Sequence, residues 1–266
     1  MYMNRIKQIG ARAAYASGKI LNDHFGQRLQ ITKKGAIDLV TQADIASEKA
    51  IIATIREAFP DHAILAEESG MTNGNHDAMW IIDPLDGTTN FAHGLPAFSI
   101  SIAFAQGNEI VMGIVFNPRN AEFFSAIKGR GAFLNDHPIH VSETQHVADS
   151  LLVTGFPYNV REKTDTIIQR LTQCLTATQG VRRLGSAALD LCWVACGRFD
   201  GFWEEDLKPW DVAAGTLIVQ EAGGQVTDFR DQTYLPLARK DGDEIIATNG
   251  HIHSRMVALM QLKDHT

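Results

Sequence analysis

The stretch WIIDPLDGTTNF, residues 80–91, ends an apolar run with Asp83 and Asp86 and then adds glycine, two threonines and asparagine. Ionised carboxylates this close repel one another, and each raises the pKa of its neighbour. A bound divalent cation removes that repulsion. Pro84 fixes φ and interrupts strand pairing, which predicts a turn that aims both carboxylates and the Leu85 carbonyl into one space.

Two further acidic positions have a similar setting. Glu67 and Glu68 end the strand-like AILAEE, and Asp211 precedes a small-residue helix in KPWDVAAG, where we expect it to be the N-cap. Taken singly, such residues are ordinarily caps or solvated surface. Apolar strands with acidic tips tend to bring those tips to one sheet edge, so together they predict a carboxylate cluster. Hard oxygen ligands without histidine or thiolate select Mg²⁺ or Mn²⁺ over zinc or copper.

The residues after the aspartates suit a phosphate group. Gly87 lets the backbone approach a ligand closely, and a helix beginning at Thr88 would offer its first free N–H groups and the positive end of its dipole. A metal site would then adjoin a phosphate site. This combination predicts metal-assisted transfer of a phosphoryl group to water.

Elements that could position these residues follow from hydrophobic periodicity. In the first half we expect an amphipathic opening helix, a connector over residues 33–44, a helix over 45–59, strand-like segments at 63–68 and 79–83, and a meander over 98–107, 109–118 and 121–129. In the second half we expect strands at 151–156, 200–204, 224–229 and 244–249, helices near 162–178, 186–196 and 212–224, and a last helix. This pattern predicts mixed layers of helix and sheet.

Composition narrows the class of protein. The chain has 266 residues, 45% of them hydrophobic, and a net charge of −7. Its overall charge therefore does not attract it to nucleic acid or to an anionic membrane. The opening segment carries too many polar residues for an export signal or a membrane span. Three cysteines without a CxxC pair favour a reducing cytoplasm. We expect a single structural unit over residues 1–266, with a weakly marked boundary between two packed halves near residues 145–150.

The motifs WIIDPLDGTTNF and PWDVAAGTLIVQEAGG resemble the two signatures of the inositol monophosphatase family. The resemblance extends through DLVTQAD, AEESG, GRGAFLN, LLVTGFP and RRLGSAALDL, the last especially similar to the bacterial inositol-1-monophosphatase group. It implies an α+β fold in a layered αβαβα sandwich of the inositol monophosphatase and fructose-1,6-bisphosphatase type. It also implies a magnesium-dependent, lithium-sensitive homodimer.

The resemblance assigns metal ligands by position. Glu67, Asp83 and the Leu85 carbonyl match the family's first metal site, and Asp83, Asp86 and Asp211 match the second. Two or three Mg²⁺ ions are implied, with Mn²⁺ as a possible substitute. The second ion would stabilise the charge that develops on the leaving alkoxide.

Catalytic and phosphate-binding roles follow in the same way. Thr88, supported by Asp44, matches the threonine that positions the attacking water, and Glu67 belongs to the same catalytic group. The amides of Gly87 and Thr88 match the phosphate contacts. A hydroxyl beside a metal-bound water and backed by a carboxylate can orient that water and help to deprotonate it.

The resemblance also assigns residues that would bind the hydroxyls of the substrate. Glu204 and the segment of Gly185, Ser186 and Ala187 match the family's inositol-contacting residues, although Ser186 could also be a helix N-cap. The full substrate-binding set comprises Leu85, Asp86, Gly87, Thr88, Gly185, Ser186, Ala187, Glu204 and Asp211. In WEEDLKPWD the chain departs from the bacterial group through Glu205 and Asp206, which bears on polyol preference. Lys33, Lys34 and Gly35 resemble a family loop over the site, and a solvated turn fits them equally.

These observations predict a cytoplasmic Mg²⁺-dependent phosphatase that hydrolyses inositol 1-phosphate through in-line attack of a metal-activated water. Fructose-1,6-bisphosphatase and 3′-phosphoadenosine 5′-phosphate phosphatase are alternatives with the same metal core, and DGTTNF favours the inositol branch. An interaction role with RNA or the transcription machinery, with catalysis secondary, is the alternative from another class. The chain has no long basic stripe to support it.

Overall fold

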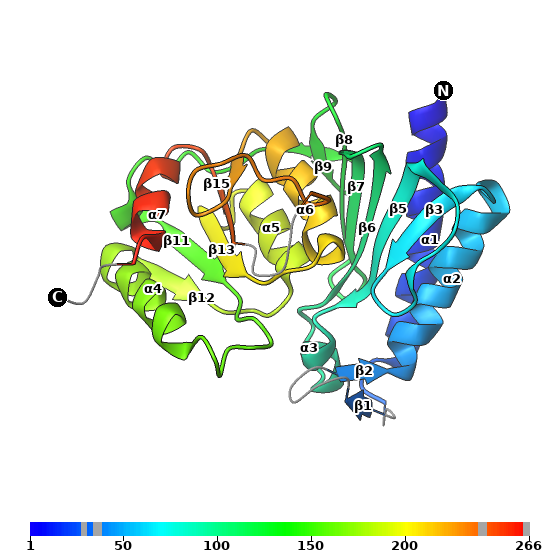
Figure 1. Ribbon diagram of the computed structural model, residues 1–266, viewed down its shortest axis with the longest axis horizontal. Coiled ribbons are helices and arrows are strands. Elements are labelled where there is room, and N and C mark those ends of the chain that lie inside the picture. Colours follow the sequence, from blue (N-terminus) through cyan, green and yellow to red (C-terminus); the bar gives the residue numbers. More distant parts are fainter. Residues whose placement is uncertain (28–30, 34–38, 239–243, 263–266) are drawn as a thin grey trace.

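The computed structural model describes residues 1–27, 31–33, 39–238 and 244–262. Five layers follow one another in the order helix, sheet, helix, sheet, helix (Figure 1). Helices α1 (Tyr2–His24) and α2 (Gln42–Ala58) cover one face of the first sheet, and α5 (Ala187–Ala195) and α6 (Pro209–Glu221) lie between the two sheets. Helices α4 (Thr164–Ala177) and α7 (His253–Met260) cover the far face of the second sheet. The predicted αβαβα sandwich is therefore confirmed.

The first sheet has eight strands within the described residues, in the order β10-β9-β8-β7-β6-β5-β3-β4. Its strands are β3 (His62–Ala66), β4 (Gly70–Met71), β5 (Asn75–Asp86), β6 (Ser99–Gln106), β7 (Glu109–Asn117), β8 (Glu122–Ile127), β9 (Ala132–Leu134) and β10 (His137–Ile139). The antiparallel run from β6 to β8 confirms the predicted meander. A small separate sheet pairs β1 (Ile31–Lys33) with β2 (Leu39–Thr41).

The outer helix layer follows from helical periodicity. Helix α1 (Tyr2–His24) buries Ile6, Ala13, Ala14 and Leu21 along one face, and α2 (Gln42–Ala58) buries Ile51 and Ile55. This three-to-four-residue spacing places an apolar stripe against the sheet, as predicted. None of the helices in the described ranges combines the length and the apolar character that crossing a membrane would need.

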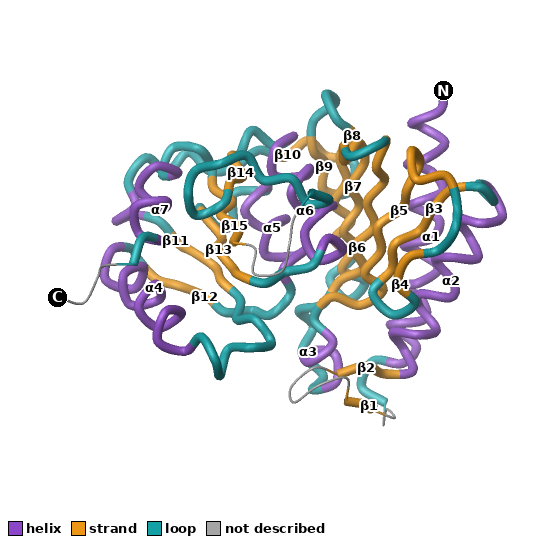
Figure 2. The backbone as a smooth tube through the Cα atoms, viewed as in Figure 1, coloured by secondary structure: helices purple, strands orange, loops and turns teal. Residues whose placement is uncertain are grey.

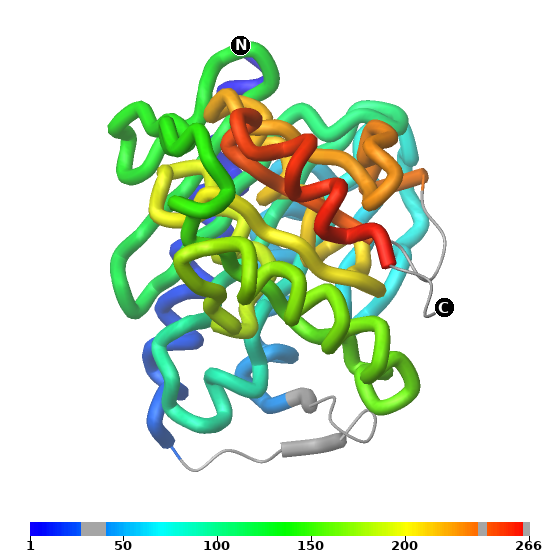
Figure 3. Tube along the Cα trace, turned by 90° about the vertical axis from the view of Figure 1, so that its left-hand side faces the viewer, coloured from blue at the N-terminus to red at the C-terminus, as the bar shows by residue number. Residues whose placement is uncertain are grey.

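The second sheet has five strands in the order β12-β11-β13-β15-β14 within the described residues. Its elements are β11 (Leu151–Thr154), α4 (Thr164–Ala177), β12 (Gly180–Arg182), α5 (Ala187–Ala195), β13 (Gly201–Glu205), α6 (Pro209–Glu221), β14 (Gln225–Thr227), β15 (Glu244–Thr248) and α7 (His253–Met260). Strands β11, β12 and β13 are parallel, whereas β15 is antiparallel to both β13 and β14. Figure 3 shows α4 and α7 side by side over the outer face.

The central helices join the two sheets. Helices α5 and α6 are apolar on nearly all sides, and one continuous core cluster contains their buried residues together with residues of both sheets. A helix that is hydrophobic all round must be buried. The tube view in Figure 2 shows both helices enclosed between the two sets of strands.

Two predicted boundaries were wrong. Residues 42–44 belong to α2 rather than to a connector, because Thr41 caps the helix and its side-chain oxygen accepts from the Ala43 amide. Asp211 is the third residue of α6 rather than its N-cap, because the helix begins at Pro209. Pro is favoured in the first turn, where its missing N–H has no helical partner to lose. The predicted connector also contains strand β2 (Leu39–Thr41), which pairs with β1. The short strands β1, β2, β4, β9, β10 and β12 were not predicted.

Candidate active site

A cavity of about 430 Å³ lies where elements of both sheets and the central helices meet. The four carboxylates predicted to converge all line it: Glu67, Asp83, Asp86 and Asp211. They come from the loop after β3, the end of β5 and the first turn of α6. Leu85, Gly87, Thr88, Gly185, Ala187 and Glu204 line the same cavity, so nearly all the predicted site residues lie around one space.

The end of β5 that carries Asp83 is held from both sides. The Leu85 amide donates a 2.9 Å hydrogen bond to the Asp83 carboxylate, and the Ser47 hydroxyl of α2 donates a 2.8 Å bond to the Pro84 carbonyl. Pairing with β6 shifts register between Asp83 and Asp86. A β-bulge of this kind re-aims side chains at the end of a strand. The predicted turn at Pro84 was wrong: Pro84 lies within β5, and the interruption of pairing expected from it takes the form of a bulge.

Asp86 joins the two halves of the sequence. Its Oδ2 accepts a 2.5 Å hydrogen bond from the Ser186 hydroxyl and a 2.9 Å bond from the Ala188 amide at the start of α5. Ser186 occupies the N-cap position of α5, but its side chain makes no capping bond. Its hydroxyl orients Asp86 instead, and it does not itself line the cavity.

Asp211 is fixed by its own helix. The Lys208 amide donates a 2.7 Å hydrogen bond to the Asp211 carboxylate. In this bond the side chain of the third helical residue accepts from the amide of the N-cap residue. One carboxylate oxygen is thereby held back toward the N-terminus of α6. The side chain nevertheless faces the cavity, so the wrong cap assignment leaves its predicted place in the cluster intact.

Burial, with some mutual repulsion, disfavours ionisation of the carboxyls in this cluster. Burial raises the pKa of Asp83 well above its usual range, and the charges of Glu67, Asp86 and Asp211 raise it further. Burial raises the pKa of Asp86 to about 6, against the hydrogen bonds from Ser186, Ala188 and Ala187. Burial, followed by the charge of Asp86, raises the pKa of Asp211. Three carboxyls that resist ionisation in one cavity are the condition that a divalent cation relieves.

The donor set suits a hard cation. It consists of carboxylates and the Leu85 carbonyl facing one cavity, and of the described residues that line the cavity, none is histidine or cysteine. Oxygen-only ligands fit Mg²⁺ or Mn²⁺. Within the described ranges, no three His, Cys, Asp or Glu side chains already enclose one point in the manner of a preformed metal site. Binding would therefore require the carboxylates to turn toward the ion.

Thr88 and Asp44 form the predicted pair. The Thr88 hydroxyl lies 3.1 Å from Oδ1 of Asp44 and 3.0 Å from the Leu85 carbonyl, and it can donate to either. The other Asp44 oxygen accepts from the amide and the hydroxyl of Thr41, at 2.9 and 2.5 Å. Burial raises the pKa of Asp44, and these hydrogen bonds lower it. Asp44 is fully buried, whereas Thr88 reaches the cavity.

Gly87 is required by space and by backbone conformation. It has φ of 90°, and a Cβ there would lie 3.0 Å from the Ala97 carbonyl and 3.1 Å from that of Gly185. Only glycine adopts this conformation at no steric cost. Helix α3 (Thr88–Ala92) begins directly afterwards, as predicted, with Gly87 as its N-cap. Asn90 of α3 donates 2.7 Å bonds to the carbonyls of Ala97 and Leu184, which fixes the segment before α5 against the motif.

Glu204 adds a further buried carboxyl to the lining of the cavity. It is 7% exposed and lines the cavity from the end of β13. Burial raises its pKa well above the usual range, the nearby Arg183 charge opposes this, and Asp211 and Asp86 add to it. A carboxylate in this position can accept hydrogen bonds from hydroxyl groups in the cavity.

The two acidic residues that depart from the bacterial group are paired. Glu205 forms a buried ion pair with Arg170 of α4, and Asp206 lies 2.6 Å from the Lys163 ammonium. Hydrogen bonds from Lys163 and Asn159 and the charges of Lys163 and Lys208 lower the pKa of Asp206, against burial. These carboxylates hold the loop between β13 and α6 against α4.

Several cavity residues were not predicted. Phe156, Pro157, Tyr158, Arg183 and Trp210 all line it. The sequence shows Phe and Pro after the strand-like run LLVTG and a Trp directly before Asp211. Neither pattern indicates which surface of the fold these side chains face. Lys34 and Gly35 of the predicted loop lie outside the described residues, and only the backbone of Lys33 is described.

Asp190 of α5 was also missed. It is fully buried, and neither of its carboxylate oxygens has a hydrogen-bond partner among the described residues. Burial, with the charges of Glu204 and Asp86, raises its pKa, and Arg183 opposes this. A charged residue on the apolar face of SAALDL was the signal that could have found it.

The chain matches known proteins along nearly its whole length. The model of the inositol monophosphatase family matches residues 3–264. An inositol-1-monophosphatase of Synechocystis is 46% identical over 251 residues, which are 94% of this chain and 86% of that protein. A Nus factor SuhB of Pasteurella multocida is 43% identical over 253 residues, 94% of this chain and 91% of that protein. The crystal structure of an extragenic suppressor protein suhB from Bartonella henselae has a TM-score of 0.92 at 39% identity, covering 98% of this chain and 100% of that one.

Proposed function

The chain belongs to the inositol monophosphatase family, and from this premise we propose that it is a Mg²⁺-dependent phosphatase that hydrolyses inositol 1-phosphate to inositol and phosphate. The observation that carries the proposal is the convergence of Glu67, Asp83, Asp86 and Asp211 on one cavity that also contains Thr88. Family membership supports phosphatase activity. The choice of substrate and the roles of single residues are our proposals.

Metal binding is assigned to the carboxylate cluster. Glu67, Asp83 and the Leu85 carbonyl would hold one Mg²⁺ ion, and Asp83, Asp86 and Asp211 a second. Bound Mg²⁺ supplies Lewis-acid chemistry: it lowers the pKa of a coordinated water and stabilises charge on phosphoryl and leaving-group oxygens. The raised pKa values of Asp83, Asp86 and Asp211 support this assignment.

The Thr88 hydroxyl would orient the attacking water. A hydroxyl that donates its proton to Asp44 keeps its lone pairs for a hydrogen bond from that water. Asp44 is held by two bonds from Thr41, so it fixes the direction of the Thr88 hydroxyl. None of the described residues lining the cavity is Ser, Cys or His, which supports direct in-line attack without a phosphoenzyme.

A neutral polyol suits the wall around Glu204. Its carboxylate can accept hydrogen bonds from vicinal hydroxyls. Glu205 and Asp206 lie beside it, but Arg170 and Lys163 offset their charges. A second phosphate placed there would meet the Glu204 carboxylate, with Arg183 and Lys208 as the cationic residues among the described lining of the cavity. This favours a monophosphate over fructose 1,6-bisphosphate or 3′-phosphoadenosine 5′-phosphate.

Phosphate release measured side by side on these three compounds tests the substrate choice. Inositol 1-phosphate should give the highest kcat/KM, and a strong preference for either bisphosphorylated compound overturns it. Asp86→Asn should abolish turnover while the chain still folds, because a ligand is lost without a change of volume. Turnover that survives this substitution overturns the metal assignment.

An interaction role with the transcription machinery is the second candidate. The observation that favours it is the 43% identity to a protein named Nus factor SuhB. A cellular phenotype that Asp86→Asn leaves unchanged would separate this role from catalysis. The predicted homodimer stays a prediction, which the molar mass in solution tests.

A further inference from the structure

We propose that Gly155 is a positioning residue for substrate recognition: its missing side chain provides the space in which the Glu204 carboxylate lies. This inference rests on the proposed function, because it assigns hydroxyl recognition to Glu204. It concerns a residue that does not line the main cavity and that neither motif contains.

The two residues meet across parallel strands. β11 and β13 pair with Thr154 opposite Trp203, so the next residues along, Gly155 and Glu204, are neighbours. A Cβ built on Gly155 would overlap both carboxylate oxygens and the carboxyl carbon of Glu204, well inside van der Waals contact. The carboxylate thus occupies the volume that any side chain at position 155 would need.

Backbone conformation gives no other reason for glycine here. Gly155 is not among the described glycines with positive φ, so an alanine could adopt its backbone conformation without strain. Gly87 and Gly185, in contrast, both have positive φ. Steric exclusion by Glu204 is the constraint that remains at position 155.

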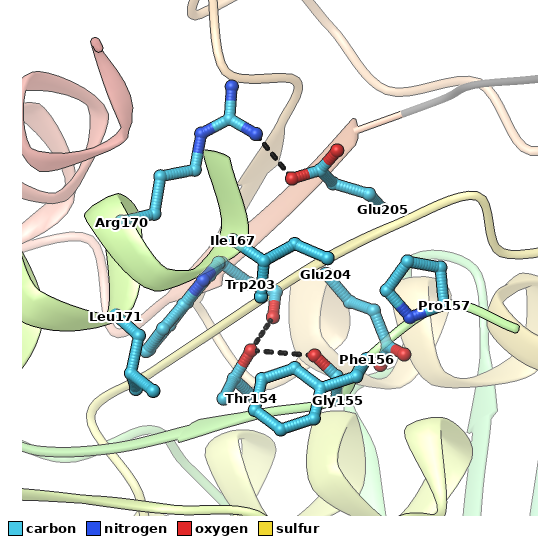
Figure 4. A pocket seen from close by; sticks show the side chains of 10 residues that line it. All are labelled: Thr154, Gly155, Phe156, Pro157, Ile167, Arg170, Leu171, Trp203, Glu204 and Glu205. Carbon is cyan, nitrogen blue, oxygen red and sulfur yellow. Dashed lines mark hydrogen bonds and ion pairs between the residues drawn. The ribbon is translucent and has the colours of Figure 1, made fainter. Parts of the chain in front are cut away.

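The surroundings leave the carboxylate as the group that must move. The Thr154 hydroxyl donates to the Trp203 carbonyl at 2.7 Å, which fixes the two strands together, and the Arg170–Glu205 ion pair holds the next residue of β13 (Figure 4). The end of a flexible glutamate side chain yields at lower cost than two hydrogen-bonded strands. An alanine at position 155 should therefore fold and displace the Glu204 carboxylate.

Glu204 lies between two spaces. It lines the main cavity and also a small pocket on its other side, which Gly155, Trp203 and Arg170 help to enclose. A carboxylate displaced from Gly155 loses its position toward the main cavity. Recognition of substrate hydroxyls should weaken, whereas the metal-ligand candidates and Thr88 keep their own supports.

Gly155→Ala tests this with two substrates. Inositol 1-phosphate carries hydroxyls for Glu204, and phenyl phosphate carries none. We expect kcat/KM for inositol 1-phosphate to fall about tenfold or more, mainly through KM, and that for phenyl phosphate to change less than about twofold. Gly180→Ala is the matched control, because a Cβ on this β12 glycine would make ordinary contacts of 3.4 and 3.8 Å.

A double-mutant cycle with Glu204→Ala shows whether the effect runs through Glu204. Once the carboxylate is gone, adding Gly155→Ala should cost no further activity toward inositol 1-phosphate. The double variant also has no steric conflict, so it should fold even if Gly155→Ala alone does not. Thermal melting of all four proteins checks this.

Three results would overturn the proposal: an equal loss on both substrates, no loss on inositol 1-phosphate, or additive losses in the cycle. Failure of the proposed function has a different signature. In that case the unmodified protein hydrolyses neither ester, or its hydrolysis of phenyl phosphate survives Asp86→Asn.

Discussion

The Ser186 hydroxyl donates a 2.5 Å hydrogen bond to Oδ2 of Asp86, which connects the N-terminus of α5 to the bulged end of β5. With the Ala188 amide, it orients the carboxylate that is central to the proposed metal site. Ser186 therefore affects the chemistry through Asp86, although it does not line the cavity itself.

Removing this hydroxyl should weaken Mg²⁺ binding. The Ser186 hydrogen bond lowers the pKa of Asp86, so Ser186→Ala should raise that pKa and let protons compete better with the ion. We expect the Mg²⁺ concentration for half-maximal activity to rise about three- to tenfold near pH 7. The kcat at saturating Mg²⁺ should be nearly restored. A Mg²⁺ titration that matches that of Thr176→Ala, a control on α4 remote from the site, would contradict this.

Replacing Thr88 should affect the chemical step. Thr88→Val keeps the shape but removes the hydroxyl that contacts Asp44, so kcat should fall about a hundredfold or more. Thr88→Ser retains the hydroxyl and should keep most of the activity. Steady-state kinetics at saturating Mg²⁺ and substrate provide the comparison. Equal kcat values for the two variants would remove Thr88 from the mechanism.

Stability should depend on pH with opposite signs in the absence and presence of Mg²⁺. Asp83, Asp86 and Asp211 have raised pKa values in the folded chain, and Asp86 titrates near 6. Between about pH 4 and pH 6 the folded chain then binds more protons than the unfolded chain, so these groups lower the free energy of unfolding as pH rises. Mg²⁺ binds the ionised forms, so the stabilisation it gives should increase with pH.

Melting temperatures with EDTA and with millimolar Mg²⁺, each at about pH 5.5 and about pH 8, measure this dependence. The Mg²⁺-induced rise in Tm should be larger at the higher pH. A rise that is independent of pH, or larger in acid, would mean that these carboxylates do not hold the ion.

The Arg170–Glu205 ion pair should matter for stability. Both side chains are 10% exposed, and Arg170 also donates to the Met260 carbonyl and lies over the Phe229 ring. Arg170→Met removes the nearer cation from the buried Glu205, leaving Lys163 at 3.8 Å, and should cost about 3 kcal/mol of unfolding free energy. Urea unfolding measures it, with Arg12→Met, which breaks the exposed pair with Glu57, as the control. Equal costs for the two variants would contradict a special role for the buried pair.

Sequence patterns predicted that the carboxylates of the metal-ligand candidates converge because Glu67 and Asp83 end apolar runs and Asp211 precedes a small-residue helix. In the structure Glu67 follows β3 and Asp83 lies near the end of β5, and tertiary packing brings them into one cavity with Asp211 even though its cap assignment was wrong. Most long elements followed from periodicity, whereas the αβαβα order of the layers was implied by the family resemblance. The convergence of the carboxylates could thus be predicted from residue types and their positions in the chain.

Other residues that line the cavity could not be predicted in the same way. Phe156 and Trp210 meet at the cavity only because the loop after β11 approaches the start of α6, and no local pattern records that approach. The ion pair between Glu205 and Arg170 could not be predicted either, because nothing in the sequence of α4 marks Arg170 as the partner of a distant carboxylate. Three-residue strands such as β12 are too short to show a period.

Diffraction from crystals grown with Mn²⁺ and phosphate, recorded to give an anomalous signal from manganese, would test the central claim most directly. We predict manganese peaks in the cavity, in contact with Glu67, Asp83, Asp86 and Asp211, with phosphate beside Gly87 and Thr88. Manganese absent from this cavity, or bound only elsewhere on the protein, would contradict the proposed site.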